Sequence, residues 1–340
     1  MKKYVSDIHN FFLSNGKDKT LDDFLISLPE YISKTNKGET MNYTLALQIS
    51  KICNFMVEKG LMLKTYSNPM MCIQEKFVSV PLTNFTPVEE VERDLEYGSF
   101  DFECNGFLSI YDCFKGSVVP IVGEKANGDP DIGTSYYIGG NLFVTAAHCI
   151  IGLKRFNILI ENKPIALEEV WFADGIDSDI YDLAIIKVRE KVNLPPFMLD
   201  ESSVLDSVLV MGYPPIPGFD AVLVSEKASI STDLQQLMTK TSTGQVVAVK
   251  NSYMSGMEYF IINARVKGGN SGGPVINKLG KVVGTIFQLP LDSQGGSDGG
   301  RYDLMGFGVC FPSRYTQLLI DNHIVKTVQQ DGGYYSVCEQ

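Results

Sequence analysis

The 340-residue sequence is poor in histidine and has no clustered cysteines. It contains three histidines and seven cysteines, the latter at positions 53, 72, 104, 113, 149, 310 and 338. No two cysteines form a CxxC pair or another tight cluster, so their spacing indicates neither a zinc site nor a disulfide framework. We therefore expect no metal and no other cofactor.

Long apolar runs and an excess of basic charge are also missing. No run approaches the ~18 apolar residues of a spanning helix, and no apolar segment of a secretory signal follows Lys2 and Lys3. The net charge of −11 argues against binding to anionic membranes and makes nucleic acid an unexpected partner. The 44% hydrophobic and 20% charged residues are ordinary for a soluble globular protein. We expect a cytoplasmic location.

Three short motifs carry the chemical information in the chain. Residues 268–274 read GGNSGGP, with Ser271 in a glycine-rich turn, and residues 144–149 read VTAAHC, with His148 after an apolar strand. Between them, Asp182 begins the strand-like run DLAIIKV. A serine hydroxyl is a poor nucleophile until a base takes its proton, and an aspartate can orient a histidine for that task. The pattern predicts Ser271 as nucleophile, His148 as base and Asp182 as orienting acid.

Other residues compete for two of these roles. Asp177 and Asp179 lie just upstream of Asp182, which we prefer because an apolar run follows it directly. The remaining histidines, His9 and His323, lie on or beside predicted helices. We interpret both as surface or structural residues.

The three motifs, in the order histidine, aspartate and serine, resemble those of the trypsin-like (chymotrypsin-fold) serine peptidases, especially the bacterial HtrA/Deg branch. That branch typically has Gly-Asn-Ser-Gly-Gly-Pro around the nucleophile, and GFGVCFPS at residues 306–313 resembles its last barrel strand. The resemblance covers roughly residues 115–325, where short apolar runs separated by turn residues also favour a barrel or sandwich. It implies a mainly β fold of two six-stranded antiparallel barrels and peptide hydrolysis through an acyl-enzyme.

The resemblance also implies an oxyanion hole and a substrate pocket. The backbone N–H groups of Gly269 and Ser271 would form the oxyanion hole. If Arg265 faces the pocket, an acidic P1 side chain is expected. If Arg265 faces solvent, a small or medium apolar P1 side chain is expected. The residues implied to line the pocket are Arg265, Val266, Phe287, Leu289 and Gly308.

The chain departs from these peptidases in ways that bear on control. Asn270 stands where secreted trypsins carry the aspartate that pairs with a freed N-terminus, so activation by that route is not expected. Cys149 has no partner cysteine on the preceding strand, which predicts a free thiol. No PDZ-like segment follows the peptidase. The glycine-rich segment 289–305 would be either an activation loop beside the pocket or an ordinary surface loop.

The first 85 residues fall outside the resemblance. Apolar residues at helical spacing predict three helices, the second with a cap-like start at Thr20, and two strands then follow over 61–66 and 70–78. This is the order of a winged helix, so DNA binding is one interpretation. A helical interaction module is favoured, because the third helix carries only Lys51 and Lys59 as cations.

These observations predict a small α+β, winged-helix-like interaction domain at 1–85, an acidic linker at 86–114, a peptidase domain at 115–325 and a C-terminal tail at 326–340. The predicted function is that of a bacterial serine endopeptidase acting on protein or peptide, with a regulatory protein partner binding residues 1–85. Two alternatives stay open. One is a DNA-binding regulator whose peptidase domain cleaves itself or a partner, and the other is a catalytically silent binding scaffold.

Overall fold

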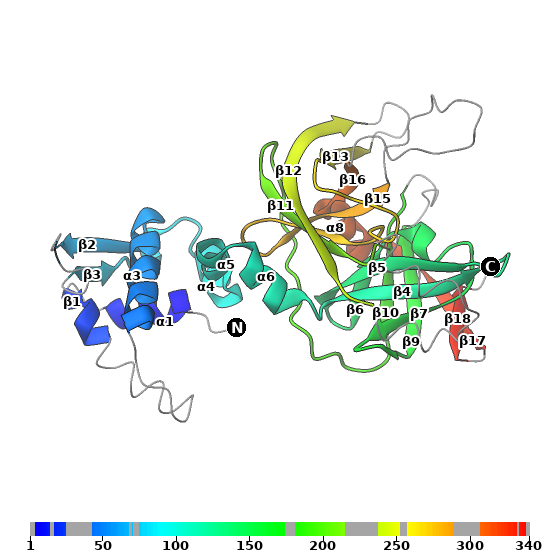
Figure 1. Cartoon of the computed structure of the whole chain (residues 1–340), viewed down its shortest axis with the longest axis horizontal. Helices are drawn as coiled ribbons and strands as arrows, with labels where there is room; N and C mark the ends of the chain where they lie inside the picture. The colour runs from blue at the N-terminus through cyan, green and yellow to red at the C-terminus, as the bar shows by residue number, and fades with distance from the viewer. Residues whose placement is uncertain are drawn as a thin grey trace. The chain divides into compact units, whose positions relative to one another are not determined.

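The chain divides into two units, Met1–Gly106 and Phe107–Gln340. Helices surround a small sheet in the first unit, and strands dominate the second (Figure 1). The computed structural model describes residues 4–13, 17–24, 43–67, 70, 75–173, 181–214, 237–251, 257–288, 307–331 and 333–337.

The first unit packs helices on a three-stranded antiparallel sheet of order β1-β3-β2. The β2–β3 pairing confirms the predicted hairpin. A cluster of buried apolar side chains that includes Phe12, Ile52 and Phe77 joins α1, α3 and the sheet. The elements of this unit are α1 (Tyr4–Phe12), β1 (Lys19–Thr20), α3 (Tyr43–Glu58), β2 (Met62–Tyr66), β3 (Lys76–Ser79), a 3₁₀ turn (Leu82–Asn84), α4 (Val88–Tyr97) and α5 (Ser99–Asn105).

The predicted helix start at Thr20 is present. The Thr20 N–H donates to Asp23 Oδ2 at 2.7 Å, and the Asp23 N–H donates to Thr20 Oγ1 at 3.1 Å. This reciprocal pair is of the capping-box type and satisfies N–H groups that have no partner inside the helix. Residues 21–24 are helical, and the rest of the predicted helix lies outside the described residues. The winged-helix order therefore stays a prediction.

The segment 86–114, which we predicted as an acidic linker, is helical over most of its length. It forms α4, α5 and α6 (Phe107–Phe114). Leu95 of α4 belongs to the core cluster of the first unit, whereas Phe114 of α6 stacks on Phe197 of the second unit at a centroid distance of 4.3 Å. The acidic residues of α4 that suggested a linker lie mostly on the exposed face of an amphipathic helix.

The second unit contains two closed antiparallel barrels, as the resemblance implies, but only one of them has six strands. Its order is β11-β12-β13-β16-β15-β14. The strands of this barrel are β11 (Ser207–Gly212), β12 (Lys240–Asn251), β13 (Glu258–Ile262), β14 (Pro274–Ile276), β15 (Val282–Gln288) and β16 (Gly308–Pro312).

The first barrel corrects the prediction of six strands. Eight strands close it in the order β18-β17-β9-β10-β6-β5-β4-β7, through the pairing of β18 with β7, and β8 pairs with β7 beyond this ring. Its strands are β4 (Val118–Lys125), β5 (Pro130–Gly139), β6 (Leu142–Thr145), β7 (Leu153–Ile160), β9 (Leu167–Ala173), β10 (Ala184–Val188), β17 (His323–Asp331) and β18 (Tyr334–Val337), and β8 is Lys163–Pro164.

The two additional strands come from the C-terminal region, where we predicted a tail at 326–340. β17 pairs with β9 from His323↔Ala173 to Thr327↔Glu169, and β18 meets β7 at Tyr335↔Phe156. The β9 partners lie about 150 residues upstream and the β7 partner about 180, and nothing local in the sequence identifies them. The preceding helix α8 (Ser313–Asp321) confirms the helix that was predicted beside His323.

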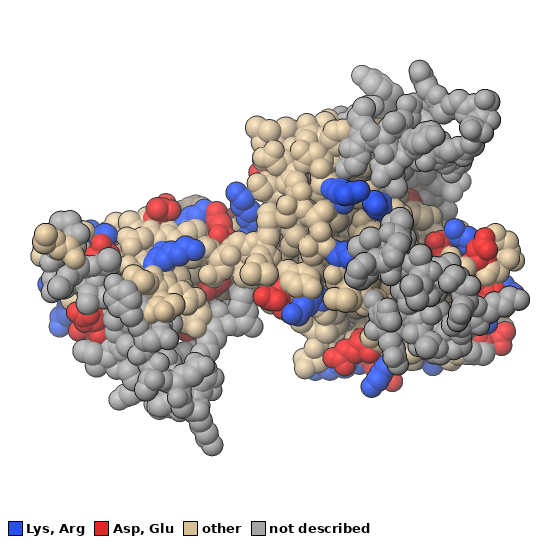
Figure 2. All heavy atoms as spheres, in the orientation of Figure 1, with Lys and Arg blue, Asp and Glu red and all other residues tan. Residues whose placement is uncertain are grey.

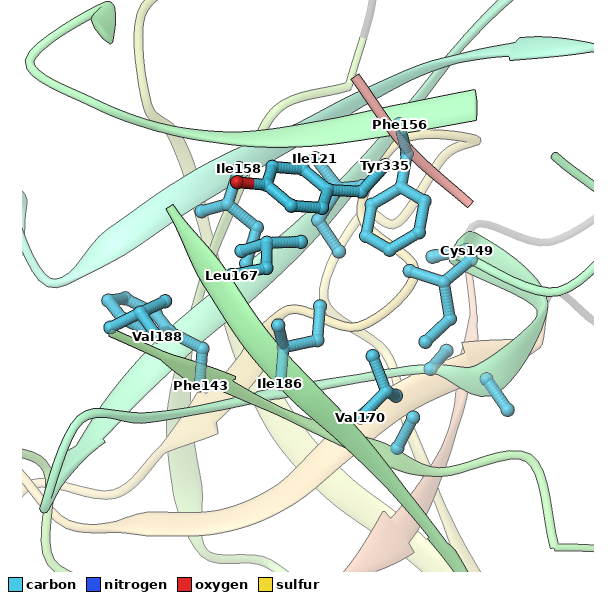
Figure 3. Packing of buried hydrophobic residues seen from close by; sticks show 14 of the residues in the cluster. Ile121, Phe143, Cys149, Phe156, Ile158, Leu167, Val170, Ile186, Val188 and Tyr335 are labelled. Atoms are coloured by element: carbon cyan, nitrogen blue, oxygen red, sulfur yellow. The ribbon is translucent and has the colours of Figure 1, made fainter. Parts of the chain in front are cut away.

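The C-terminal hairpin helps to build the core of the first barrel. Figure 3 shows Tyr335 beside Phe156 and Ile121 in the same apolar cluster as Cys149. Tyr335 is 4% exposed, so its ring is part of the packed interior. Because Cys149 directly follows His148, this core also supports the histidine turn.

Charges on the first unit do not separate by sign on the face shown in Figure 2. Basic and acidic side chains are interspersed there among the described residues. A nucleic-acid-binding module usually gathers Lys and Arg on one face. Within the described ranges, no helix combines the length and the hydropathy that crossing a bilayer requires.

We expect Tyr335→Ala to destabilise the first barrel by about 3–5 kcal/mol, the usual effect of removing a buried aromatic ring. Urea unfolding can be followed by the fluorescence of Trp171, the one tryptophan of the chain, which lies in β9. The matched control is Tyr334→Ala, because Tyr334 is only partly buried and its ring lies under Arg155 at 4.5 Å. Tyr334→Ala should lower the free energy of unfolding by about 1 kcal/mol or less. Equal losses for the two variants would contradict a structural role for the hairpin.

Candidate active site

His148 and Asp182 are brought together by neighbouring strands of the first barrel. His148 lies in the 3₁₀ turn η3 (Ala147–Cys149) just after β6, and Asp182 lies just before β10, which pairs with β6. The ring Nδ1–H donates to Asp182 Oδ2 at 2.5 Å, and the His148 backbone N–H donates to Asp182 Oδ1 at 2.8 Å. One carboxylate therefore holds both the ring and the backbone of His148.

The surroundings of His148 favour its charged form. Burial of the ring acts to lower the pKa, but hydrogen bonds to Asp182 and Cys149 and the negative charges of these two groups outweigh burial and raise the pKa of His148 to about 10. The ring therefore lies beside two groups that favour its protonated form.

Ser271 lies in a turn that requires glycine. The Asn270 N–H donates to Lys267 O at 3.0 Å, and Gly269 has a φ of +89°, the hydrogen bond and positive φ of a type II turn. Gly272 has a φ of +80°, and a Cβ atom there would lie 2.1 Å from the Thr134 carbonyl oxygen. Glycine is the residue that adopts these conformations without a steric penalty.

Two N–H groups of this turn are free. Within the described ranges, the N–H groups of Gly269 and Ser271 have no hydrogen-bond acceptor. By contrast, the N–H groups between and after them donate to backbone carbonyls, Asn270 to Lys267 O, Gly272 to Ile286 O and Gly273 to Asn270 O. Two free N–H groups beside a serine can stabilise an oxyanion.

The serine turn meets the histidine turn through the Ser271 carbonyl oxygen. This oxygen accepts hydrogen bonds from the Thr134 N–H at 2.9 Å and from the Cys149 Sγ at 3.4 Å. Across the described residues, Ser271 Oγ and the His148 ring share no hydrogen bond. Catalytic hydrogen bonds of this type often form only when substrate is bound.

Cys149 has a free thiol, which confirms the prediction that it lacks a disulfide partner. On β5, Gly133 lies opposite it, where a Cβ atom would be 2.7 Å from Cys149 Sγ. The neighbouring strand therefore offers no side chain at this point. Cys53, Cys104 and Cys310 also have free thiols.

The implied pocket residues do not all have similar environments. Arg265 is exposed, whereas Val266 is fully buried, and a Cβ atom on Gly308 would lie 2.8 Å from Val266 Cγ2. Phe287 packs against the core of the first barrel and stacks on Phe311 at 4.0 Å. Leu289 and the segment 289–305 lie outside the described residues, as do the alternative acids Asp177 and Asp179.

The two other histidines have structural contacts. In the first unit, His9 Nε2 lies 2.9 Å from Val80 O, and burial lowers the pKa of His9 although this hydrogen bond acts to raise it. His323 stacks on Trp171 with ring centroids 4.0 Å apart. These contacts agree with the interpretation of His9 and His323 as structural residues.

No motif in the sequence indicates a role for Thr134, which is fully buried on β5. Its hydroxyl donates to Gly269 O at 2.6 Å, from the first barrel to the serine turn. A threonine in a strand carries no local signal of such a contact, because the partner lies 135 residues further along the chain.

Comparison with known proteins identifies this region of the chain. Residues 133–284 match the model of the trypsin-like peptidase domain. The serine protease HTRA4 of Homo sapiens is 32% identical over 146 residues, or 42% of this chain and 27% of that protein. The serine protease Rv3671c of Mycobacterium tuberculosis (strain ATCC 25618 / H37Rv) is 26% identical over 164 residues, or 47% of this chain and 36% of that protein. Residues 133–284 are thus a trypsin-like peptidase domain homologous to HtrA-type serine proteases.

The similarity covers only part of each protein. The chain spans between 27% and 36% of the length of these two relatives. Among solved structures, the crystal structure of the active form of the Rv3671c protease aligns with a TM-score of 0.47 and 19% identity, over 66% of this chain and 87% of that chain.

The imidazole groups should titrate in a defined order. We expect His148 to lose its proton at a higher pH than an ordinary histidine and His9 at a lower pH, because their pKa values are shifted in opposite directions. NMR of the three histidine rings as a function of pH measures this order. Asp182→Asn should lower the His148 pKa and leave the His9 pKa unchanged. A His148 pKa that does not respond to Asp182→Asn would contradict the pairing.

Proposed function

We propose that the protein is a serine endopeptidase whose catalytic groups are His148, Asp182 and Ser271. The observation that carries the proposal is the pair of hydrogen bonds by which Asp182 holds His148, next to a serine turn with two free N–H groups. This combination supplies an oriented base, a serine and donors for a developing oxyanion. The homology of residues 133–284 to serine proteases supports the same reaction.

The proposed reaction proceeds in two halves. His148 accepts the proton of Ser271 Oγ while this oxygen attacks the carbonyl carbon of the peptide bond. The N–H groups of Gly269 and Ser271 bind the negative oxygen of the tetrahedral intermediate. His148 then donates the proton to the leaving amine, which leaves an acyl-enzyme. A water molecule, deprotonated by His148, attacks the ester and releases Ser271.

The pocket residues favour a small or medium apolar P1 side chain. Arg265 is exposed, so its guanidinium is not buried where it would bind an acidic side chain. Val266 and Gly308 are buried against each other, and Val266 belongs to the apolar core of the second barrel, so this point offers no charged group to a P1 side chain. The exposure of Arg265 therefore favours the apolar alternative of the two that the sequence left open.

Ser271→Ala should abolish peptide hydrolysis and labelling by a fluorophosphonate probe, with a loss in turnover on the order of 10⁶-fold. Labelled protein and the rate of peptide cleavage are the measurements. The matched control is Ser203→Ala, since Ser203 is an exposed serine remote in sequence from the three motifs. Labelling of Ser271→Ala at the wild-type rate would overturn the assignment. A wild-type protein that neither cleaves peptides nor reacts with the probe would instead indicate a silent scaffold.

We further propose that the first unit regulates the peptidase by binding a protein partner in the cytoplasm. Asn270 lacks the charge for activation by a freed N-terminus, so control must use another route. The first unit exposes several large apolar side chains that a partner could cover, namely Leu47, Leu63, Tyr66 and Met70. The free thiols of Cys53, Cys149 and Cys310 fit a reducing compartment.

Removal of residues 1–106 should change the rate of peptide cleavage, because the proposed partner acts through this unit. The truncated chain should begin at Phe107, since Phe102 is buried within the first unit. A partner that raises the active population from 1% to 99% must favour the active state by ~5.5 kcal/mol. Even a tenth of this free energy would give a measurable change in the cleavage rate. Urea unfolding followed by Trp171 fluorescence verifies that the barrels stay folded. Identical rates and substrate preferences for the two chains would contradict regulation by this unit.

A further inference from the structure

Every polar backbone and side-chain group of Thr134 is engaged around the serine turn. Its hydroxyl donates to Gly269 O at 2.6 Å and accepts the Tyr213 N–H at 3.1 Å. Its N–H donates to Ser271 O at 2.9 Å, and its carbonyl oxygen accepts the Thr145 hydroxyl at 2.8 Å. Thr134 is fully buried, so water does not replace these bonds.

The two carbonyl groups held by Thr134 belong to the residues whose N–H groups are free. Because a peptide unit is planar, a bonded carbonyl fixes the orientation of the whole unit. The unit after Gly269 is also held by the Asn270 N–H, and the unit after Ser271 by the Gly272 N–H. The unit 270–271, which carries the Ser271 N–H, lies between these two held units, and the unit 268–269, which carries the Gly269 N–H, comes directly before the first of them. By holding these neighbouring units, Thr134 helps to determine the direction in which the turn presents the two N–H groups.

The start of the turn has no side chain that could provide another anchor. Residues 268 and 269 are both glycine, and glycine rotates about its backbone bonds at little cost. Gly268 is exposed, and a Cβ atom built on it would meet nothing within 4 Å. Besides the hydrogen bond between Asn270 and Lys267, the Thr134 hydroxyl is the contact that holds this stretch in the described structure.

We propose that Thr134 is a positioning residue for the oxyanion hole of the peptidase. It touches neither the substrate nor the reacting atoms, and it acts by holding the Gly269 and Ser271 peptide units against the first barrel. This inference rests on the proposed function of Ser271 and extends it to a residue outside the three motifs. It predicts that the Thr134 hydroxyl affects the transition state more than the binding of substrate.

The test is the kinetics of Thr134→Val, which keeps the size of the side chain and removes its hydroxyl. We expect kcat to fall about 10²-fold, the usual effect of losing one oxyanion-hole donor, with little change in KM. Affinity for a peptide aldehyde, whose adduct with Ser271 carries an oxyanion, should fall by a similar factor. The acid limb of the pH–rate profile should not move, because the bonds between His148 and Asp182 are untouched.

Two variants separate positioning from stability. Thr134→Ser keeps the hydroxyl and should restore kcat to within about threefold of wild type, whereas Thr134→Cys keeps a small side chain with only a weak donor and should not. The matched control is Ser135→Ala, which removes a buried hydroxyl from the next residue of β5 that contacts Val119 O instead of the serine turn. Its kcat should stay near that of wild type.

The outcomes distinguish this inference from the proposed function. A Thr134→Val or Thr134→Cys enzyme with wild-type kcat overturns the positioning role alone, as does an equal loss in Ser135→Ala. A Thr134→Ser enzyme as slow as Thr134→Cys has the same consequence, and this comparison holds even if Thr134→Val fails to fold. A wild-type protein without cleavage or probe labelling overturns the proposed function and this inference together.

Discussion

The carbonyl oxygen of Ser271 is the point at which the two barrels meet at the candidate site. It accepts hydrogen bonds from the Thr134 N–H on β5 and from the Cys149 thiol beside the histidine. The serine turn extends from the second barrel, and both donors belong to the first. Because these contacts join separate barrels, the distance between Ser271 and His148 depends on how each barrel is closed.

Closure of the first barrel depends on the end of the chain. β17 and β18 fill the gap between β9 and β7, and Tyr335 enters the core that lies beneath Ala147 and Cys149. A closed barrel has no free strand edges, so the loops at its end are held from all sides. The histidine turn is therefore supported by residues that lie almost 190 positions later in the chain.

Asp182 has opposing effects on the base. One of its hydrogen bonds holds the imidazole ring of His148 and the other holds the backbone N–H, but its charge also helps to raise the pKa of His148 and so favours the protonated ring. A protonated imidazole cannot accept the Ser271 proton. In the reaction proposed above, His148 therefore has to lose this proton before it accepts that of Ser271.

The amino-acid sequence by itself determined the local features of the site. Glycine at 269 and 272 permits the serine turn, and the apolar runs around His148 and Asp182 form the paired strands β6 and β10. These features depend on the backbone preferences of neighbouring residues, so a motif is enough to predict them. The amphipathic helix α4 shows the limit of such reasoning. Its acidic residues are typical of a linker, but Leu95 on its apolar face lies in the core of the first unit. Only the tertiary structure decided the eight-stranded closure, the exposure of Arg265 beside the buried Val266 and the contact of Thr134 with the serine turn. Each of these joins or places segments that are far apart in the sequence, and their side chains carry no local sign of the partner that the fold brings to them.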